Sequence, residues 1–563
     1  MRIRDLLCFI AAGIICLAEF IACNNKTTDT SDVFVSSPQQ MQAKASDIIR
    51  SSLGDALEKK GLLADSTMLR QARLINLLYQ ENEFSPLWCK EEHWLPIGDT
   101  LNQFIKKVQF FGLFPEDYHA KDLDSINQRF IKDSLAKTDR RNASLWAKAD
   151  MMLTDALFSI IKDVKLGRLP QDSVTLRKDS VLSDSFYLAQ WDIVKKSTSV
   201  NQLINSLEPN QTGYRHLKKG IPEFLDSASY KQFTIVPTPG KDKANFKKAL
   251  QKRLYEEGFI AFDSVAADSA QLVQAVKKFQ EKKGITVDGR AGEGTVRMLN
   301  LTDREKFIRI AISMDKYKML PEIMPSKYVW VNLPAFQMQL IEGDSVKISS
   351  KVICGKPLTR TPLLTSAISE LITYPQWVPP PSIIMKEILP AVKKNPGYLE
   401  KKGFSLVDKD GNVVDPYTVD WSKYNKGIPY RVVQGSGDAN ALGIMKFVFA
   451  NKYSVYLHDT NQRYLFGQTY RSLSHGCVRV QEWEKLAFYL LRNDSISSAN
   501  RSSRADSVRT WLRNKQKRSI ALKNKMPVFI RYITCEGYNS GIVFYDDIYG
   551  DDKRLREKYF ASK

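Results

Sequence analysis

Two kinds of hydrophobic periodicity divide this chain. From about residue 41 to residue 233, apolar side chains recur at three- and four-residue spacing, most regularly in residues 66–79, 101–111 and 143–164. Such spacing predicts amphipathic helices. Beyond Pro321 apolar and polar residues alternate instead, which predicts strands over residues 328–333, 336–341, 346–354, 444–450, 453–458 and 526–535. The pattern therefore predicts a multidomain α+β protein, helical in its N-terminal part and β-rich in its C-terminal part.

Turn and breaker residues subdivide these two parts. Residues 237–240, Pro-Thr-Pro-Gly, indicate a linker. Short helical patterns follow it, the first closed by Gly258, and a longer helix ends at Pro321. The stretch from Pro379 to Gly443 is too long for an idle loop, so we expect an insertion or lid near the site.

The predicted boundaries follow from these marks. We expect a helical scaffold domain at residues 43–236, a small three-helix module at 241–302, a connecting helix at 303–325, a β-rich catalytic domain at 326–536 with a lid insertion at about 380–443, and a C-terminal tail at 537–563.

Length and charge narrow the class of protein. A chain of 563 residues exceeds one core, and 43% hydrophobic with 26% charged residues is typical of globular domains. The net charge of +21 suggests contact with something anionic. No dense basic block with interleaved aromatic residues is present, so we expect no nucleic-acid partner. The alternatives are a solvated basic surface or one that faces an acidic envelope polymer.

The N-terminus predicts an exported protein. Arg2 and Arg4 precede an apolar run over residues 6–21, typical of a signal peptide. The run ends in Ala22-Cys23, which resembles a bacterial lipoprotein processing site. The resemblance implies a signal peptide over residues 1–23, an acylated Cys23 that anchors the chain to a membrane, and a flexible tether over residues 24–42. An uncleaved anchor helix and a soluble secreted protein are the alternatives.

The remaining cysteines and histidines do not suggest a metal site. Cys354 and Cys535 both lie in strand-like runs; buried free thiols are the default for them, and a bridge between them stays open. The histidines outside residues 458–477 have no cysteine or histidine at ligand spacing, and His458, His475 and Cys477 alone do not complete a zinc site. We expect no metal and no cofactor.

Residues 458–479 carry the candidate chemistry. His475 stands two positions before Cys477, and His458 ends a predicted strand upstream. An imidazole that takes the proton of a thiol makes it a strong nucleophile. The amides of Gly476 and Cys477 are candidate oxyanion donors, and Arg479 is a candidate clamp for a substrate carboxylate. The set predicts acyl transfer through a thioester, with either histidine as the base.

These residues resemble a known family. Ser474-His475-Gly476-Cys477-Val478-Arg479, with His458-Asp459-Thr460 upstream, is similar to the signature of YkuD-type L,D-transpeptidases. Residues 243–301, through the run Ala275 to Gln280, Asp288-Gly289 and Thr295, resemble a three-helix peptidoglycan-binding module. The domain order resembles the large YcbB-like subgroup.

The resemblance implies a role for each matched residue. Cys477 is then the nucleophile and His458 the general base, oriented by the backbone carbonyl of Asp459. His475, Gly476 and Cys477 shape the oxyanion pocket, while Ser474 and Arg479 support the loop and the substrate. Asp459 replaces the family's common glycine, and its charge is expected to raise the pKa of His458. Tyr456 and Trp377 are candidates for lining the cleft, although an aromatic residue in a strand is by default a core residue.

The implied function is that of a peptidoglycan L,D-transpeptidase. Such enzymes take the acyl group of a tetrapeptide stem, release D-alanine and form 3→3 cross-links. The expected partners are peptidoglycan stem peptides and glycan, with a membrane through the lipid anchor, and the expected location is the periplasmic side of a bacterial envelope. The alternatives are an L,D-carboxypeptidase, attachment of proteins to the wall, or a non-catalytic peptidoglycan-binding lipoprotein.

Overall fold

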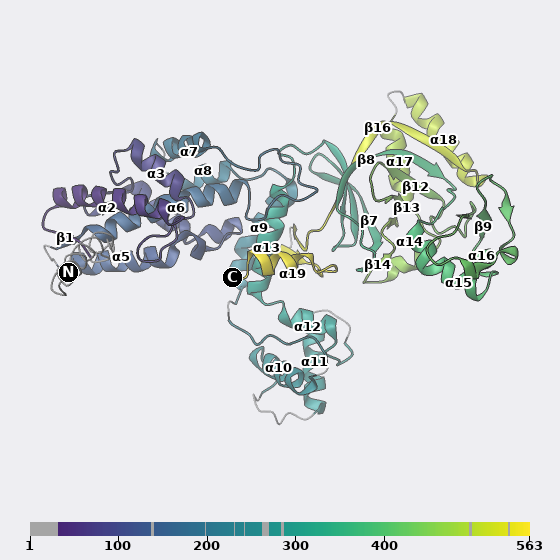
Figure 1. Ribbon diagram of the computed structural model, residues 1–563, viewed down its shortest axis with the longest axis horizontal. Helices are drawn as coiled ribbons and strands as arrows, with labels where there is room; N and C mark the ends of the chain where they lie inside the picture. The colour runs from purple at the N-terminus through teal and green to yellow at the C-terminus, as the bar shows by residue number, and fades with distance from the viewer. Residues whose placement is uncertain are drawn as a thin grey trace, which may run out of the picture. The chain divides into compact units, whose positions relative to one another are not determined.

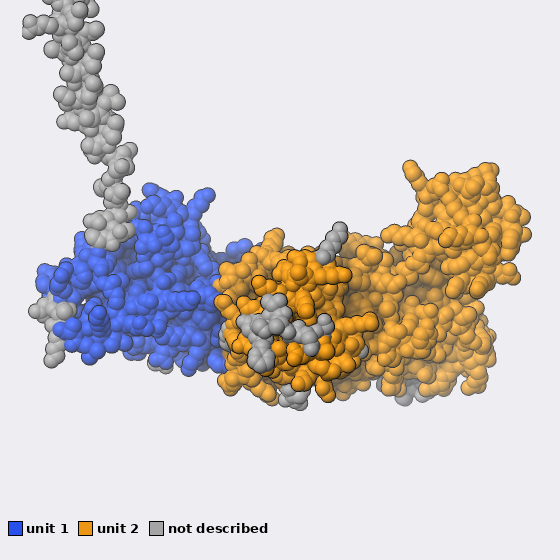
Figure 2. Space-filling model, turned by 90° about the horizontal axis from the view of Figure 1, so that it is seen from below, with its two compact units in different colours: residues 1–167, 179–208 blue, residues 168–178, 209–563 orange. Residues whose placement is uncertain are grey.

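The computed structural model describes residues 32–136, 140–196, 199–229, 231–240, 242–261, 269–282, 287–494, 498–538 and 541–563. The chain forms two compact units, Met1–Gly167 with Asp179–Glu208, and Arg168–Lys178 with Pro209–Lys563 (Figure 2). The predicted signal peptide and Cys23 lie outside the described residues. Among the described helices, none has the length and apolar character needed to cross a membrane.

The first unit is helical, as predicted. Its helices are α2 (Pro38–Glu58), α3 (Ala72–Glu81), α4 (Pro96–Ile105), α5 (Ala120–Leu135), α6 (Ala143–Lys165), α7 (Asp184–Lys196) and α8 (Val200–Ser206). Helix α6 is buried along nearly its whole length, with the other helices around it (Figure 1). Its carboxylates satisfy buried donors: Asp150 accepts from the Tyr79 hydroxyl at 2.5 Å and from the Trp88 amide at 2.9 Å. These bonds fix loops to the central helix.

The expected tether ends earlier than residue 42. Strand β1 (Phe34–Val35) pairs with β4 (Arg141–Asn142), and α2 begins at Pro38. The Ser37 hydroxyl caps α2 by accepting from the Gln40 amide, and Met41 is fully buried. Residues 34–42 therefore belong to the folded unit, because Met41 supplies core contacts that a tether would not make.

The second unit contains a helical group and the predicted small module. Its helices include α9 (Thr212–Ser227), α10 (Lys243–Glu256), α11 (Ser269–Lys282), α12 (Glu293–Asn300), α13 (Asp303–Lys318) and α19 (Asp551–Tyr559). Helices α10 to α12 share a core in which Leu254, Phe279 and Leu299 are fully buried. The buried Gln280 side chain accepts from the Gly289 amide at 2.9 Å, which holds the turn before α12.

Two segments pack across the predicted domain boundaries. Helix α9, expected in the scaffold, packs on the hairpin β17 (Cys535–Tyr538) and β18 (Gly541–Phe544) of the second unit. Residues 537–563, expected as a tail, form this hairpin's end and α19. Gly537 permits the contact, since a Cβ there would lie 2.1 Å from the His216 carbonyl oxygen. Lys316 of α13 pairs with Asp552 of α19 at 2.5 Å.

The β-rich domain is built on one nine-stranded sheet. The strand order is β14-β7-β15-β13-β12-β8-β16-β5-β6, and β6 also pairs with β7, which closes the ring. The strands are β5 (Lys327–Asn332), β6 (Gln337–Glu342), β7 (Ser345–Gly355), β8 (Leu364–Thr373), β12 (Met445–Phe449), β13 (Leu457–His458), β14 (Ser472–Ser474), β15 (Val478–Val480) and β16 (Arg518–Arg531). Alternating residues such as Val331, Leu371 and Leu457 are fully buried and form its core with α17 (Trp483–Asn493) and α18 (Ser498–Arg513).

The predicted insertion is a folded piece with its own core. It holds the helices α14 (Pro381–Ile383), η3 (Ile384–Ile388), α15 (Leu389–Lys394) and α16 (Tyr398–Lys401), and the strands β9 (Phe404–Val407), β10 (Val413–Val414) and β11 (Arg431–Gln434) (Figure 1). Leu399, Leu406 and Val432 are fully buried in it. A separate core makes this segment a small subdomain beside the sheet.

Candidate active site

Cys477 lies where two strands of the sheet run parallel. Leu457 of β13 is level with Val478 of β15, and both are fully buried. The Val478 amide donates to the Tyr456 carbonyl at 3.1 Å, which places the preceding residue, Cys477, beside Tyr456. Burial raises the pKa of the Cys477 thiol, and hydrogen bonding with Tyr456 partly opposes that rise. The thiol is therefore uncharged at neutral pH.

His458 is also held uncharged. Its side chain belongs to a residue only 4% exposed, and its Nδ1 has no hydrogen-bond partner within the described residues. Burial lowers the pKa of the imidazole to about 3, and the positive charges of Arg479 and Lys446 act in the same direction. The ring centroids of His458 and Tyr456 are 5.6 Å apart. Tyr456 thus contacts both the imidazole and the thiol.

The expectation that Asp459 raises the pKa of His458 is wrong. The Asp459 carboxylate accepts from Arg463 at 3.0 and 2.6 Å and from the Ile444 amide at 3.1 Å. Arg463 therefore balances the negative charge of Asp459, so that this charge does not raise the pKa of the imidazole. The backbone carbonyl of Asp459 does favour the protonated imidazole, but burial outweighs it.

His475 is directed toward the insertion. Its Nε2 bonds the Glu387 carboxylate of η3, and the His475 residue is exposed. Residues 475 and 477 do not share one regular strand, because β14 ends at Ser474, β15 begins at Val478, and Gly476 between them has φ +127°. That φ requires glycine. The sequence could not tell this break from a continuous strand.

The backbone of this loop differs from the predicted oxyanion pocket. The Gly476 amide donates to the Ser474 hydroxyl at 3.1 Å, and that hydroxyl donates to the Cys477 carbonyl at 2.6 Å. Gly476 therefore has no free donor. In the described part of the chain, the amides of Cys477 and His475 have no hydrogen-bond partner.

A network of buried hydrogen bonds supports the loop that carries Cys477. The Thr361 hydroxyl donates to the Gly476 carbonyl at 2.8 Å, and the Thr361 amide donates to the Tyr549 hydroxyl at 3.2 Å. That hydroxyl donates in turn to the Gly355 carbonyl at 2.7 Å. The support from Thr361 and Tyr549 could not be predicted from the sequence, because only the folded chain brings residue 549 to this loop.

Three further side chains surround the thiol. Arg479 donates to Gln462 at 2.9 Å, while its buried Nε has no partner among the described residues. Lys446 of β12 lies over the Tyr456 ring, with 3.9 Å from Nζ to the ring centroid, and burial lowers its pKa. Lys446 was also not predicted as a site residue. The clue in the sequence is that a lysine alternates with apolar residues in a predicted strand. Trp377 shares a hydrogen bond with Tyr456, and its ring lies 5.9 Å from that of Phe404 in the insertion.

Cys354 and Cys535 are free and buried, so no bridge joins them. Within the described residues, no group of three or more histidine, cysteine, aspartate or glutamate side chains could hold a metal ion.

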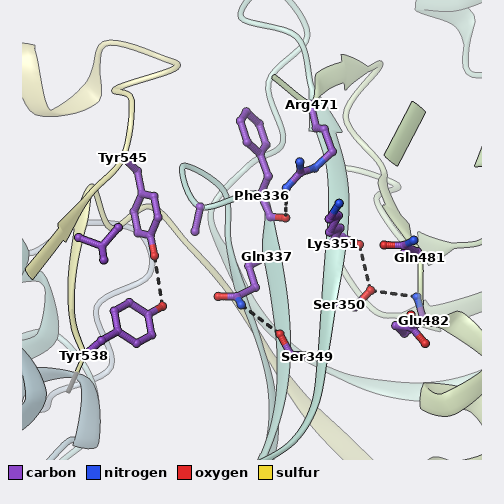
Figure 3. Close-up of a pocket in the computed structure, with 12 residues that line it drawn as sticks. Phe336, Gln337, Ser349, Ser350, Lys351, Arg471, Gln481, Glu482, Tyr538 and Tyr545 are labelled. Atoms are coloured by element: carbon purple, nitrogen blue, oxygen red, sulfur yellow. Dashed lines mark hydrogen bonds between the residues drawn. The ribbon is translucent and has the colours of Figure 1, made fainter. Parts of the chain in front are cut away.

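A surface cavity of about 540 Å³ lies along β6 and β7, where the Tyr545 and Tyr538 hydroxyls meet (Figure 3). Neither Cys477 nor His458 lines it.

Comparison with known proteins identifies the domains. The L,D-transpeptidase catalytic domain model (YkuD) matches residues 326–497, a Scaffold domain model matches residues 73–221, and a model described as "Putative peptidoglycan binding domain" matches residues 245–299. The last strand of the sheet, β16, lies beyond the first match.

Individual proteins that are similar to this chain also carry the name L,D-transpeptidase. A Haemophilus influenzae protein named "Putative L,D-transpeptidase" is 34% identical over 247 residues, 44% of this chain and 48% of that protein. The chain thus spans about half the length of this curated relative. The crystal structure of an L,D-transpeptidase from Stackebrandtia nassauensis matches 54% of this chain and 97% of its own, at 16% identity and a TM-score of 0.16. The crystal structure of an L,D-transpeptidase from Xylanimonas cellulosilytica matches 54% of this chain and 100% of its own, at 14% identity and a TM-score of 0.13. Such TM-scores are too low to add to the assignment, which rests on the domain matches. The chain therefore contains a YkuD-type L,D-transpeptidase catalytic domain, preceded by a scaffold domain and a peptidoglycan-binding domain.

Proposed function

We propose that this protein is a peptidoglycan L,D-transpeptidase that forms 3→3 cross-links through a thioester on Cys477. The observation that carries the proposal is the joint placement of a thiol, a neutral imidazole and an unpartnered guanidinium nitrogen. His458 lies on β13, Arg479 on the adjacent strand β15, and Cys477 in the loop directly before β15. An uncharged imidazole is the form that can accept the thiol proton.

In the first half-reaction, the Cys477 sulfur attacks the carbonyl carbon of the third stem residue, and its proton passes to His458. The free amides of Cys477 and His475 donate to the oxyanion. The carbon–nitrogen bond to D-alanine then breaks, the leaving amine takes the proton from His458, and the thioester remains. In the second half-reaction, the amine of another stem attacks the thioester and loses a proton through His458, and the thiol is restored.

The charge of Arg479 ties substrate binding to this proton transfer. Without a bound anion, the positive charge of Arg479 helps to lower the pKa of His458. A stem carboxylate bound at the free Nε of Arg479 offsets that charge, so the imidazole becomes a stronger base once substrate is present. Of the two histidines, His458 is the better candidate for the base, because His475 is bonded to Glu387.

The test is product analysis. Residues 24–563 are incubated with disaccharide-tetrapeptide, and the products are followed by liquid chromatography and mass spectrometry. We expect a cross-linked dimer and free D-alanine, both lost in Cys477→Ala and both retained in Cys89→Ala, which removes a buried thiol of the other unit. D-Alanine without dimer indicates an L,D-carboxypeptidase, and neither product from the unaltered chain indicates a non-catalytic wall-binding protein.

The peptidoglycan-acting domains place the protein in the cell envelope. We further propose periplasmic location through a lipid on Cys23. Mass spectrometry of the N-terminal peptide is expected to show diacylated or triacylated Cys23. Cys23→Ala is expected to move the protein from the membrane fraction to the soluble one, and retention in the membrane fraction contradicts the anchor.

A further inference from the structure

A second cavity, apart from the Cys477 site, lies between α9, the end of α13 and the strands β5, β6 and β17. Its volume is about 200 Å³. None of Cys477, His458 and Arg479 lines it. At that size it accepts the end of a chain rather than a whole drug-sized molecule.

Aromatic rings form its walls. Tyr317, Tyr328 and Trp330 line the cavity and are only 4%, 8% and 6% exposed. The rings of Tyr317 and Trp330 are nearly parallel, at 9°, with centroids 6.2 Å apart. Gly213 of α9 makes room for this arrangement, because a Cβ there would lie 2.5 Å from the Tyr317 ring. Stacked aromatic faces with little solvent attract cations.

Gln211, which lines the cavity, carries a buried acceptor that has no donor among the described residues. Gln211 is 6% exposed, and its side-chain nitrogen donates to the Pro321 carbonyl at 2.6 Å, which fixes the orientation of the amide. Its Oε1 is buried without a partner within the described residues. A buried unpaired acceptor costs free energy unless a ligand or water donates to it.

The second acceptor is a carboxylate without a cation. Glu536 lines the same cavity and accepts from the Tyr538 and Tyr545 hydroxyls, both at 3.0 Å. It forms no ion pair in the described chain, and burial raises its pKa. Neutral donors therefore surround a partly buried acid that has no positively charged partner among the described residues.

We propose that this cavity binds a primary ammonium group on a short aliphatic chain. The ammonium donates to Gln211 Oε1 and to the Glu536 carboxylate, and the aromatic walls cover the aliphatic carbons. Asp344 at the exposed mouth adds negative charge, although it also pairs with Arg215. A free alkylamine and an amino-bearing peptide side chain share this chemistry.

Titration calorimetry on the full-length protein in detergent tests the site with four probes. n-Butylammonium and the lysine side chain of N-acetyl-lysine amide supply the proposed group. n-Butanol keeps the shape without the charge, and tetramethylammonium keeps the charge without hydrogen-bond donors. We expect saturable binding of n-butylammonium, with the two control probes weaker by about tenfold or more. Binding of the lysine compound as well indicates a peptide side chain as the source, and its absence indicates a free amine. Equal binding of n-butanol, or no saturable binding of n-butylammonium, overturns the proposal.

Variants locate the binding. Gln211→Leu and Glu536→Gln are each expected to weaken n-butylammonium binding by about tenfold or more, since each removes one acceptor. Gln337→Leu is the matched control and should bind as the unaltered protein does, because Gln337 lines the cavity of Figure 3, which shares Tyr538 with the proposed site but neither Gln211 nor Glu536. Quenching of Trp330 fluorescence, lost in Trp330→Phe, gives a second readout if Glu536→Gln unfolds the protein. Unchanged affinity in a folded Gln211→Leu variant contradicts the site.

Discussion

The two sides of the Cys477 loop are held in different ways. On the side of the sheet, the Gly476 carbonyl, Thr361, Tyr549 and Gly355 form a continuous chain of buried hydrogen bonds. On the side of the insertion, the described contact is the pair between His475 and Glu387, whose side chains are 33% and 49% exposed. Exposed pairs stabilise little, whereas buried networks fix geometry. We infer that the buried network on the side of the sheet fixes the loop that carries Cys477, and that the pair with the insertion contributes little to this.

The largest expected effect is on the rigid side. His458→Gln removes the proposed base, and we expect kcat to fall by about 10²- to 10⁴-fold. The matched variant His475→Gln, on the opposite side, should lower kcat by less than about tenfold. Steady-state release of D-alanine measures both. The reverse order would transfer the role of base to His475.

The same histidine makes the rigid side sensitive to acid. In the unfolded chain an imidazole keeps its ordinary pKa of 6.5, whereas in the folded chain that of His458 is about 3. Between these values the unfolded state binds the proton and the folded state does not, so stability falls as the pH falls. The expected loss is roughly 1.4 kcal/mol for each pH unit.

Urea unfolding at pH 7, 5.5 and 4.5 measures this loss, with a probe in the sheet. His458→Gln should show a shallower decline than the unaltered protein, and His93→Gln, which changes an exposed histidine of the other unit, should not. Equal slopes for both variants would remove His458 from the explanation.

Tyr549→Phe tests whether the rigid side depends on residues beyond the catalytic-domain match. It removes the hydroxyl between Gly355 and Thr361, and we expect kcat to fall by about tenfold with little change in KM, because the loop is less well positioned. Tyr559→Phe, in the same C-terminal segment, is the control. A rise in KM with kcat unchanged argues for a role in binding instead.

The smallest effect is expected on the insertion side. Glu387→Gln should change stability by less than about 1 kcal/mol and increase hydrogen exchange in residues 381–388. The exchange of β13 and β15 should stay as it was. If the strands also become less protected, the two sides are coupled and the comparison fails.

Much of this site could be predicted from the sequence, because its parts are local. The strands ending at His458 and beginning after Cys477 follow from alternating apolar residues, and the insertion follows from its length. The hydrogen bonds were not predictable. The Gly476 amide donates to the Ser474 hydroxyl, and Arg463 forms an ion pair with Asp459. Both contacts depend on backbone angles that hydrophobic periodicity does not encode. Lys446 and Tyr549 come from distant segments, so their proximity depends on the tertiary fold.

The position of Tyr549 in the chain bears on when the enzyme becomes active. The catalytic signature ends at Arg479, yet the loop that carries Cys477 is braced through a hydroxyl at residue 549. During synthesis, the signature therefore emerges before the residue that supports it. The hydrogen bonds that link Gly476, Thr361, Tyr549 and Gly355 can form only after residues beyond the catalytic-domain match have folded back onto loop 355–361.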